Sequence, residues 1–385
     1  MSTLKVDGIR SNSASSDAIT LASDGTCTAN ITNRSNRNKI INGAMQVSQR
    51  YGTTATAISN AIVLDRFQAF IQGGGAISVQ QITDDAPTGF KNSMKILATT
   101  ADSSIAGTDQ IRFHQVLEDK NIEDLNWGSS NAKTITVSFW VKSSVTGTYC
   151  LNVVNYGSWN RSYIKEYTVS SANTWEKKTV TFTGDTSGTW GHIRLSWVLM
   201  SGTSQHATGN QWNADALFAT SNQVNWAATQ NNTFYITGVQ VEVGSVATDF
   251  EHKPYAQELA LCQRYFYAHS GGAHTVNGSD SSTPNSVLST ASCQSTSSIS
   301  VAVPLPVPMR AVPSLYSTVA GSTRYRLNSS GANTNSGSDP VVWTAGSSHT
   351  TVQMDLAGFS GLSAGQAGTV RRYDGTGILG FNAEL

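Results

Sequence analysis

Residues 133–143 read KTITVSFWVKS, and this stretch decides the fold class of the chain. Apolar and polar side chains alternate along it, and successive side chains of a β-strand point to opposite faces of a sheet. The pattern therefore predicts a strand with one face on a core and the other face outward. The inward positions are Ile135, Val137, Phe139 and Val141, and the outward positions are Thr136, Ser138, Trp140 and Lys142.

Runs of the same kind continue on both sides of this stretch, separated by Gly, Asn, Ser and Asp. Residues 192–200 are a second clear case, because Ile193, Leu195, Trp197 and Leu199 share one face, which we assign to the core. About nine strands at this spacing indicate a two-sheet sandwich of the jelly-roll type. The remaining predicted strands are 76–82, 94–99, 111–118, 148–156, 163–170, 175–184 and 233–244.

The chain is expected to be all-β, with four parts. Residues 1–37 hold few large apolar side chains and predict an extended N-terminal arm that becomes ordered on a partner. Residues 38–253 form the jelly-roll domain. Residues 254–270 contain a linking helix, because Tyr255, Leu259, Cys262 and Phe266 follow at helical spacing after Pro254. Residues 271–385 form a second, smaller β domain, with strand-like runs at 287–303, 314–319, 340–344, 350–356 and 376–385.

Composition excludes several classes of function. The 385 residues carry 25 Lys+Arg and 25 Asp+Glu, so the basic field needed for nucleic-acid binding is missing and we expect no nucleic acid as a partner. No apolar run approaches the length of a membrane span, so we expect no membrane insertion. The four cysteines show no metal-site spacing, and Cys150 and Cys262 are expected to be inert buried thiols.

Candidate catalytic and metal-binding motifs do not assemble into a site. Residues 361–365 (GLSAG) match a nucleophile-elbow string, but no histidine follows His349 to act as the base. The acidic cluster of Glu118, Asp119, Glu123 and Asp124 is interpreted as a solvated loop face. Oxygen ligands for a structural Ca²⁺ are present in Asp84, Asp85, Asp249 and Glu251, but the spacing of these residues does not define a coordination set. We therefore expect a non-enzyme without cofactors.

Aromatic side chains next to amides and arginine are more informative, because a sugar-binding site combines exposed rings with such hydrogen-bonding groups. Two segments have this mixture, one at a turn between strands and one in a long loop. The alternative is that these rings cap the sandwich ends or pack against a sister chain. The glycan-binding candidates are Tyr156 and Trp159 first and Trp212 second, with Asn155, Asn160 and Arg161 as hydrogen-bonding partners.

Seven short motifs are distinctive in combination: RNKIINGAMQV at 37–47, QR at 49–50, LDRF at 64–67, TVSFWVK at 136–142, TGVQVEVG at 237–244, ATDFE at 247–251 and ELALCQRY at 258–265. Together they resemble the jelly-roll module of bacteriophage fibre proteins over roughly residues 37–268. A weaker likeness to the start of fibre proteins from marine podovirus-like phages lies at residues 2–7 (STLKVD), and residues 307–313 and 381–385 resemble the distal domain of the same proteins.

The resemblance implies a virion fibre, usually a homotrimer, with a jelly roll similar to the carbohydrate-binding modules of glycoside hydrolases. Those modules place a Ca²⁺-binding acidic residue after Asn-Gly, whereas Ala44, Met45 and Gln46 follow Gly43 here. The expected function is adsorption of the phage to host surface polysaccharide as a tail fibre, with the N-terminal arm bound to a tail or capsid protein. Two alternatives stay open: a head fibre or decoration protein, and a glycan-degrading tailspike.

Overall fold

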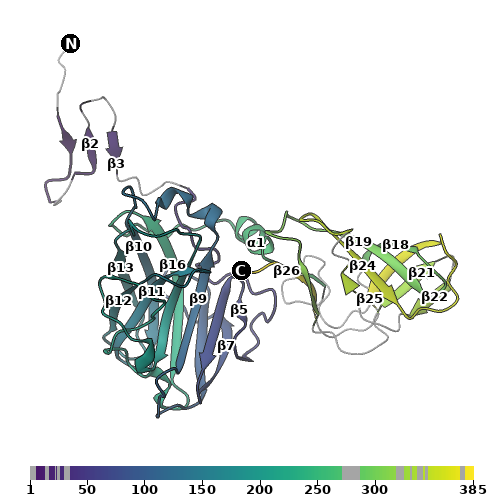
Figure 1. Ribbon diagram of the computed structural model, residues 1–385, viewed down its shortest axis with the longest axis horizontal. Helices are drawn as coiled ribbons and strands as arrows, with labels where there is room; N and C mark the ends of the chain where they lie inside the picture. The colour runs from purple at the N-terminus through teal and green to yellow at the C-terminus, as the bar shows by residue number, and fades with distance from the viewer. Residues whose placement is uncertain are drawn as a thin grey trace.

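The computed structural model describes residues 6–13, 17–21, 23, 27–29, 35–270, 287–317, 325–329, 332–335, 341–342, 346–372 and 378–385. The arm contributes β1 (Gly8–Ile9), β2 (Ile19–Leu21) and β3 (Cys27–Ala29), which pair as a small antiparallel sheet. This sheet stands apart from the large sandwich that follows it (Figure 1). No helix among the described residues is long and apolar enough to cross a membrane.

The central domain is a jelly-roll sandwich of two antiparallel sheets. The six-stranded sheet has the order β13 (Glu176–Phe182), β10 (Ile135–Ser143), β16 (Thr233–Val243), β8 (Ser93–Thr100), β7 (Ala76–Ile82) and β4 (Thr56–Ile58). The seven-stranded sheet has the order β15 (Trp212–Asn213), β12 (Ser162–Val169), β11 (Gly147–Tyr156), β14 (His192–Ser201), β9 (Gln110–Leu117), β6 (Phe67–Gln72) and β5 (Ile62–Leu64). All nine strands predicted from the sequence are present, so the fold class is confirmed.

The alternation of apolar and polar side chains in β10 and β14 builds the core between the two sheets. Every inward position predicted for these two strands is buried in one core, and Trp197 at its centre is fully buried. The Trp197 ring stacks on Phe113 from β9, with ring centres 5.3 Å apart, and meets Phe139 of the opposite sheet edge-on at 5.8 Å. Aromatic contacts of this kind add to the free energy gained by burying the rings.

The helix after the sandwich is shorter than the sequence predicts. α1 runs over Tyr255–Gln263, and the chain then enters β17 (Phe266–Ser270). The assignment of Phe266 to a helix face was therefore wrong. β17 pairs with β26 (Leu379–Asn382), near the other end of the chain, and this long-range pairing overrides the helical spacing of the local sequence.

The distal domain is a second, smaller β structure. β17, β26 and β20 (Ser314–Ser317) form one sheet. A seven-stranded sheet has the order β22 (Ala332–Asn335), β21 (Tyr325–Ser329), β25 (Ala367–Arg372), β18 (Val287–Cys293), β19 (Ser298–Pro304), β24 (Thr351–Ala357) and β23 (Val341–Val342). The proline-rich residues 305–313 form no strand and connect β19 to β20 through a series of bends.

The closing residues return to the sandwich, beside α1 (Figure 1). Glu384 forms an ion pair with Arg66, and Arg50 Nη1 lies 3.7 Å from the same carboxylate. Both guanidinium groups also stack on rings of the segment after α1, Arg66 on Tyr265 and Arg50 on Phe266, each at 3.5 Å. Charge pairing and ring stacking thus join the two domains.

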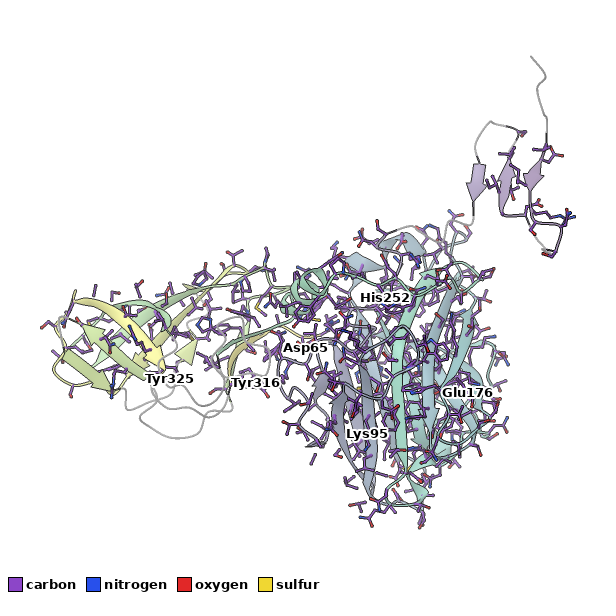
Figure 2. The ribbon with its side chains drawn as sticks, turned by 180° about the vertical axis from the view of Figure 1, so that it is seen from behind. Asp65, Lys95, Glu176, His252, Tyr316 and Tyr325 are labelled. Atoms are coloured by element: carbon purple, nitrogen blue, oxygen red, sulfur yellow. The ribbon has the colours of Figure 1, made fainter. Side chains whose placement is uncertain are left out.

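Hydrogen bonds through Gln49 reinforce the same junction. Gln49 donates its backbone N–H and its side-chain amide to the buried carboxylate of Asp65, both at 2.6 Å, and donates to the Phe266 carbonyl at 2.7 Å. Figure 2 shows Asp65 and Tyr316 on the two sides of this junction. Burial raises the pKa of Asp65, with the charge of Arg50 acting in the opposite direction.

Three cysteines are buried and free: Cys150 under a loop on the sandwich, Cys262 on α1, and Cys293 in the distal core. Burial raises the pKa of each thiol, which disfavours the reactive thiolate. The expectation of inert buried thiols for Cys150 and Cys262 agrees with this placement.

Candidate glycan-binding site

The first-choice residues meet at the tip of the β11–β12 hairpin. Tyr156 ends β11 and Trp159 follows in the turn, with their rings edge-on and 5.0 Å apart between centres. Trp159 is 42% exposed, an unusual position for so large an apolar side chain. Its φ of 55° is in the left-handed region, which is costly for any residue with a Cβ. A strained, exposed tryptophan is therefore held at this tip by its surroundings.

The hydrogen bonds of Asn155 fix the base of this turn. Asn155 is fully buried and donates its amide to Asn160 Oδ1 at 3.1 Å and to the Thr189 carbonyl at 2.9 Å. The backbone N–H of Trp159 donates to the Asn155 carbonyl at 2.9 Å. Asn155 thus acts through the shape of the turn, while the neighbouring Asn160 is exposed.

The second-choice tryptophan lies in a separate cluster. Trp212 packs edge-on against Trp127 and Trp190, with centres 5.4 and 5.3 Å away. Arg161 lies 5.6 Å from the Trp212 ring centre, and its guanidinium makes a two-pronged pair with Asp185, both bonds at 2.7 Å. The structure therefore brings Tyr156 and Trp159 together with Asn155 and Asn160, and places Trp212 and Arg161 in this tryptophan cluster.

A hollow of about 320 Å³ opens beside the tryptophan cluster, with Trp127 and Trp190 in its wall. Asp119 and Glu123 also line it. Glu123 pairs with Lys120 at 3.0 Å, and Asp119 Oδ1 accepts the Lys120 backbone N–H at 2.8 Å. Asp119 and Glu123, two of the four acidic residues interpreted as a solvated loop face, therefore border a hollow that also has aromatic walls. For Glu118 that interpretation was wrong, because its side chain is buried and accepts hydrogen bonds from Arg264 and Tyr265.

A cluster of buried polar side chains, which sequence reasoning missed, lies beneath the exposed tip. It occupies the outer face of the seven-stranded sheet, because the neighbouring residues of each strand point into the core. His114 and Asn152 each lie opposite Ser196 in the strand register, which makes the cluster continuous across three strands. We call it the arginine face, and its members are Arg112, His114, Asn152, Arg194 and Ser196.

Rings alternate with guanidinium groups across this face. The Arg194 guanidinium carbon lies 4.5 Å from the Trp159 ring centre and 5.1 Å from that of Phe218. The Arg112 guanidinium carbon lies 4.5 Å from the Phe218 ring centre and 4.0 Å from the Phe70 ring centre. Trp159 is thus the exposed end of a row of stacked cations and rings.

A loop after β14 covers this face. Phe218 and Ala219 from the loop pack on Cys150, Val154 and neighbouring apolar residues of the sheet, and the Leu217 carbonyl accepts a hydrogen bond from Asn152 at 2.9 Å. The alternation in 111–118 and 192–200 marks Arg112 and Arg194 as outward-facing. Nothing local in the sequence signals that a loop from residues further along buries them.

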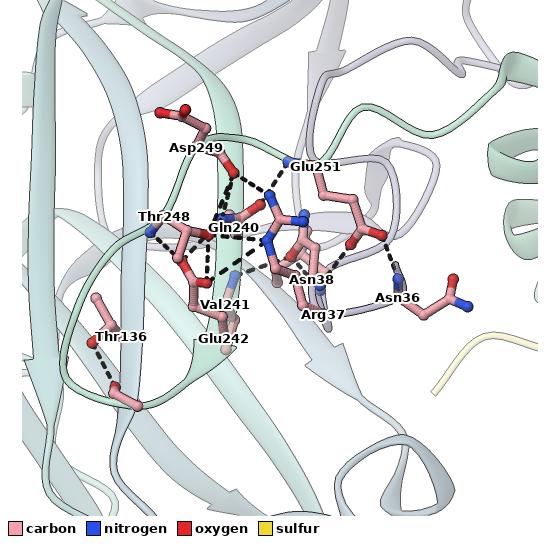
Figure 3. A network of polar contacts seen from close by, with 12 residues as sticks. Asn36, Arg37, Asn38, Thr136, Gln240, Val241, Glu242, Thr248, Asp249 and Glu251 are labelled. Atoms are coloured by element: carbon pink, nitrogen blue, oxygen red, sulfur yellow. Dashed lines mark hydrogen bonds and ion pairs between the residues drawn. The ribbon is translucent and has the colours of Figure 1, made fainter. Parts of the chain in front are cut away.

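The Glu251 carboxylate and the Asp249 backbone carbonyl, which belong to two of the four residues suggested for a calcium ion, are engaged otherwise. Glu251 accepts the backbone N–H groups of Asn36 and Asn38, and the Arg37 guanidinium reaches the Asp249 carbonyl and lies 3.9 Å from Glu242 (Figure 3). Arginine supplies the positive charge here, so these residues do not fit a Ca²⁺ site. No group of three or more His, Cys, Asp or Glu suited to a metal occurs among the described residues.

Comparisons with known proteins complete the description of the site. No family model matches the sequence, and no curated protein matches it. Similar solved structures include the enzymatically active domain of tailspike protein 4 from bacteriophage CBA120, with 11% identity, 54% of this chain and 22% of that chain covered, and a TM-score of 0.31. This chain thus spans about a fifth of the length of that tailspike chain.

Carbohydrate-binding modules are also among the similar structures. A CBM4 module has 20% identity over 51% of this chain and 100% of its own, with a TM-score of 0.28. The xylan-binding CBM22-2 domain of Xyn10C from Paenibacillus barcinonensis has 12% identity over 50% and 99%, with a TM-score of 0.26. Scores this low assign neither a family nor a function.

Proposed function

We propose that this protein is a structural, non-catalytic fibre protein of a bacteriophage particle, which attaches the particle to glycans on the host surface. The observation that carries the proposal is Trp159, a 42% exposed ring in a strained turn above a sheet face rich in hydrogen-bonding groups. A sugar ring has an apolar C–H face edged by hydroxyl groups, and it is bound by an aromatic ring beside polar side chains.

The sequence supports the phage assignment through the fibre-like motifs at residues 37–268. The order of arm, sandwich and distal domain fits an elongated fibre that is attached at one end (Figure 1). We place the protein in the virion, after assembly in the host cytoplasm. The arm holds it to a tail protein or, if it is a head fibre, to a capsid protein.

Two further copies of the same chain complete the proposed fibre. A single ring stacked on a sugar contributes little free energy, so one copy of the site binds weakly. Three copies on one rigid fibre raise the effective concentration of the second and third sites and strengthen attachment without new contacts. A homotrimer therefore suits a receptor-binding protein with weak individual sites.

One observation favours a second function, that of a glycan-degrading tailspike. Asp119 and Glu123 line the 320 Å³ hollow beside Trp127 and Trp190, and glycoside hydrolysis uses a pair of carboxyl groups. Both acids are engaged by Lys120, which fits the solvated-face interpretation better than a catalytic pair. The fibre without catalysis is therefore the leading proposal.

The test uses the purified full chain and surface polysaccharides extracted from a panel of marine bacteria. Affinity electrophoresis measures binding, and size-exclusion chromatography measures the glycan chain length before and after incubation. We expect retention by at least one polysaccharide with its chain length unchanged. Shortened chains would establish the tailspike instead, and a lack of retention across the panel and of binding to the cells would overturn glycan binding.

A further inference from the structure

The arginine face holds polar atoms that no other part of the described chain satisfies. Its five side chains are each at most 4% exposed. Unpartnered buried atoms occur on every one: Arg112 Nη1, His114 Nδ1, Asn152 Oδ1, Arg194 Nε and Nη2, and Ser196 Oγ. A buried polar atom without a partner costs free energy, so a group of them on one surface indicates a place where a polar ligand or ordered water completes the bonding.

The charge on this face has one sign. Arg194 is close enough for its charge to act on Arg112, and no carboxylate among the described residues forms an ion pair with either guanidinium. Burial lowers the pKa of Arg194 to about 10 and lowers the pKa of Arg112 well below its ordinary value, with the Arg194 charge as the second cause. Arg194 remains protonated at neutral pH.

Burial and neighbouring arginines also keep His114 neutral. Its pKa is lowered well below 6.5, mainly by burial and then by the charges of Arg194, Arg112 and Arg66. The arginine face therefore carries two buried positive charges, and its other members are a neutral imidazole, an amide and a hydroxyl group. None of these groups is negatively charged, so the positive charge is not balanced on this face. A buried charge is stable when an opposite charge pairs with it, so an anion is the complementary ligand.

We infer that the arginine face binds the carboxylate of an acidic sugar within the glycan, an inference that rests on the proposed function of glycan attachment. Unpartnered Nε and Nη2 of Arg194 present the parallel donor fork that matches two carboxylate oxygens. Asn152 and Ser196 supply hydrogen-bonding groups for sugar hydroxyls. The exposed Trp159 ring, already stacked on Arg194, receives the apolar face of the same or the next sugar.

Access to Arg194 is by way of the hairpin tip. Gly157, at the tip, has a φ of 101° and no atom within 4 Å of the place where a Cβ would lie. Because Arg194 is only 3% exposed, ligand binding as proposed requires the tip that carries Trp159 to move aside and uncover the Arg194 donors, after which the Trp159 ring packs on the bound sugar. The loop with Phe218 stays in place, because it is packed against the sheet.

The experiment takes a polysaccharide that the intact protein retains and divides it into three samples: untreated, carboxyl-reduced with carbodiimide and borohydride, and desulfated. Affinity for each is measured with the full chain, with single-stranded DNA as competitor in a parallel series. We expect carboxyl reduction to weaken binding about tenfold or more, with desulfation and DNA having no effect. Equal affinity after carboxyl reduction would overturn the inference while leaving glycan attachment intact.

Other outcomes are equally decisive. Loss of binding on desulfation alone assigns the anion to a sulfate ester, and competition by DNA assigns the face to nucleic acid; both contradict the inference. If no polysaccharide is retained at all, the proposed function itself fails.

Variants test whether the preference for the untreated over the carboxyl-reduced polysaccharide depends on the arginine face. Arg194→Gln should reduce the ratio of affinities for untreated and carboxyl-reduced polysaccharide to about one, because the remaining aromatic contacts do not distinguish the two samples. A variant that has only lost stability binds both samples less well in proportion, so the ratio separates recognition from misfolding. Arg194→Lys should keep part of the preference. The control is Lys177→Gln, which removes one positive charge at an exposed position of β13. If the ratio of the two affinities in Arg194→Gln equals that of the wild type, the assignment of the carboxylate to the arginine face is contradicted.

Discussion

The guanidinium carbon of Arg194 lies 4.5 Å from the centre of the Trp159 ring. The arginine comes from the middle of a buried sheet, and the tryptophan comes from an exposed hairpin tip whose backbone is strained at φ 55°. Stacking on a cation that has no carboxylate partner within the described chain holds the ring over the sheet face. The pair therefore links the surface of the protein to the buried charge below it.

Glu384 should be important for stability, because it is the carboxylate that faces both Arg66 and Arg50 at the junction. Glu384→Ala leaves the buried Arg66 guanidinium without its ion-pair partner and leaves Arg50 with only the buried Asp65 nearby, which costs about 3 kcal/mol or more in the free energy of unfolding. Urea denaturation measures the loss. The matched control is Glu123→Ala, which breaks an exposed pair with Lys120 and should cost less than about 1 kcal/mol. Equal stability of the two variants would contradict the role of Glu384.

His269 should make stability depend on acidity. Burial lowers its pKa from 6.5 to about 4, so the unfolded chain takes up a proton in this window before the folded chain does. The contribution of His269 is therefore complete above pH 6.5 and is lost as the pH falls towards 4, by about 3 kcal/mol. Denaturation midpoints of the wild type and of His269→Asn, compared across pH 4 to 7, test this. Parallel pH profiles would show that the neutral ring is not responsible.

Strand prediction worked where a run was long enough to show its period. Residues 133–143 and 192–200 each display four inward side chains, and the strands and core faces followed from them. The strands β4 and β5 were missed, because three residues give too few repeats of the pattern, and β6 was missed as well. The helix was extended too far, since pairing of β17 with β26 is invisible in local spacing.

The candidate site was only partly predictable for a related reason. Tyr156 and Trp159 stand out in the sequence as rings among turn-forming residues, whereas Arg112 and Arg194 look like ordinary solvent-facing positions of two strands. Their burial depends on Phe218, which arrives from a later loop. Trp212 and Arg161 have the right composition for a sugar site, but their partners, Trp190 and Asp185, come from a separate turn.

The protein is expected to be a homotrimer in solution. Light scattering of the purified chain should give a mass about three times 40.9 kDa. We expect α1 helices from three chains to pack in parallel along the three-fold axis, and the oligomer to persist on dilution to micromolar concentration. A mass of 40.9 kDa at that concentration would rule out the trimer.

The arm should be needed for attachment to the particle and dispensable for folding. A chain that starts at Ser35 keeps Asn36, Arg37 and Asn38 and hence their bonds to Glu251 and Asp249 (Figure 3). We expect this variant to fold and assemble with unchanged thermal stability, and to be missing from purified virions. Incorporation at the level of the full-length chain, measured by immunoblotting of virions, would refute the assignment.

The central claim, that the hairpin tip contacts the host glycan, is tested most directly by host-cell adsorption and thermal unfolding of Trp159→Ala, measured together. The control is Trp175→Ala, which removes a ring that contacts Tyr235 of the six-stranded sheet, away from the hairpin tip on the seven-stranded sheet. Trp159→Ala should weaken adsorption per folded trimer by about tenfold through the loss of three ring contacts, with little change in the unfolding temperature. Unchanged adsorption per folded trimer together with a lower unfolding temperature would show that Trp159 is a structural residue and would contradict the account.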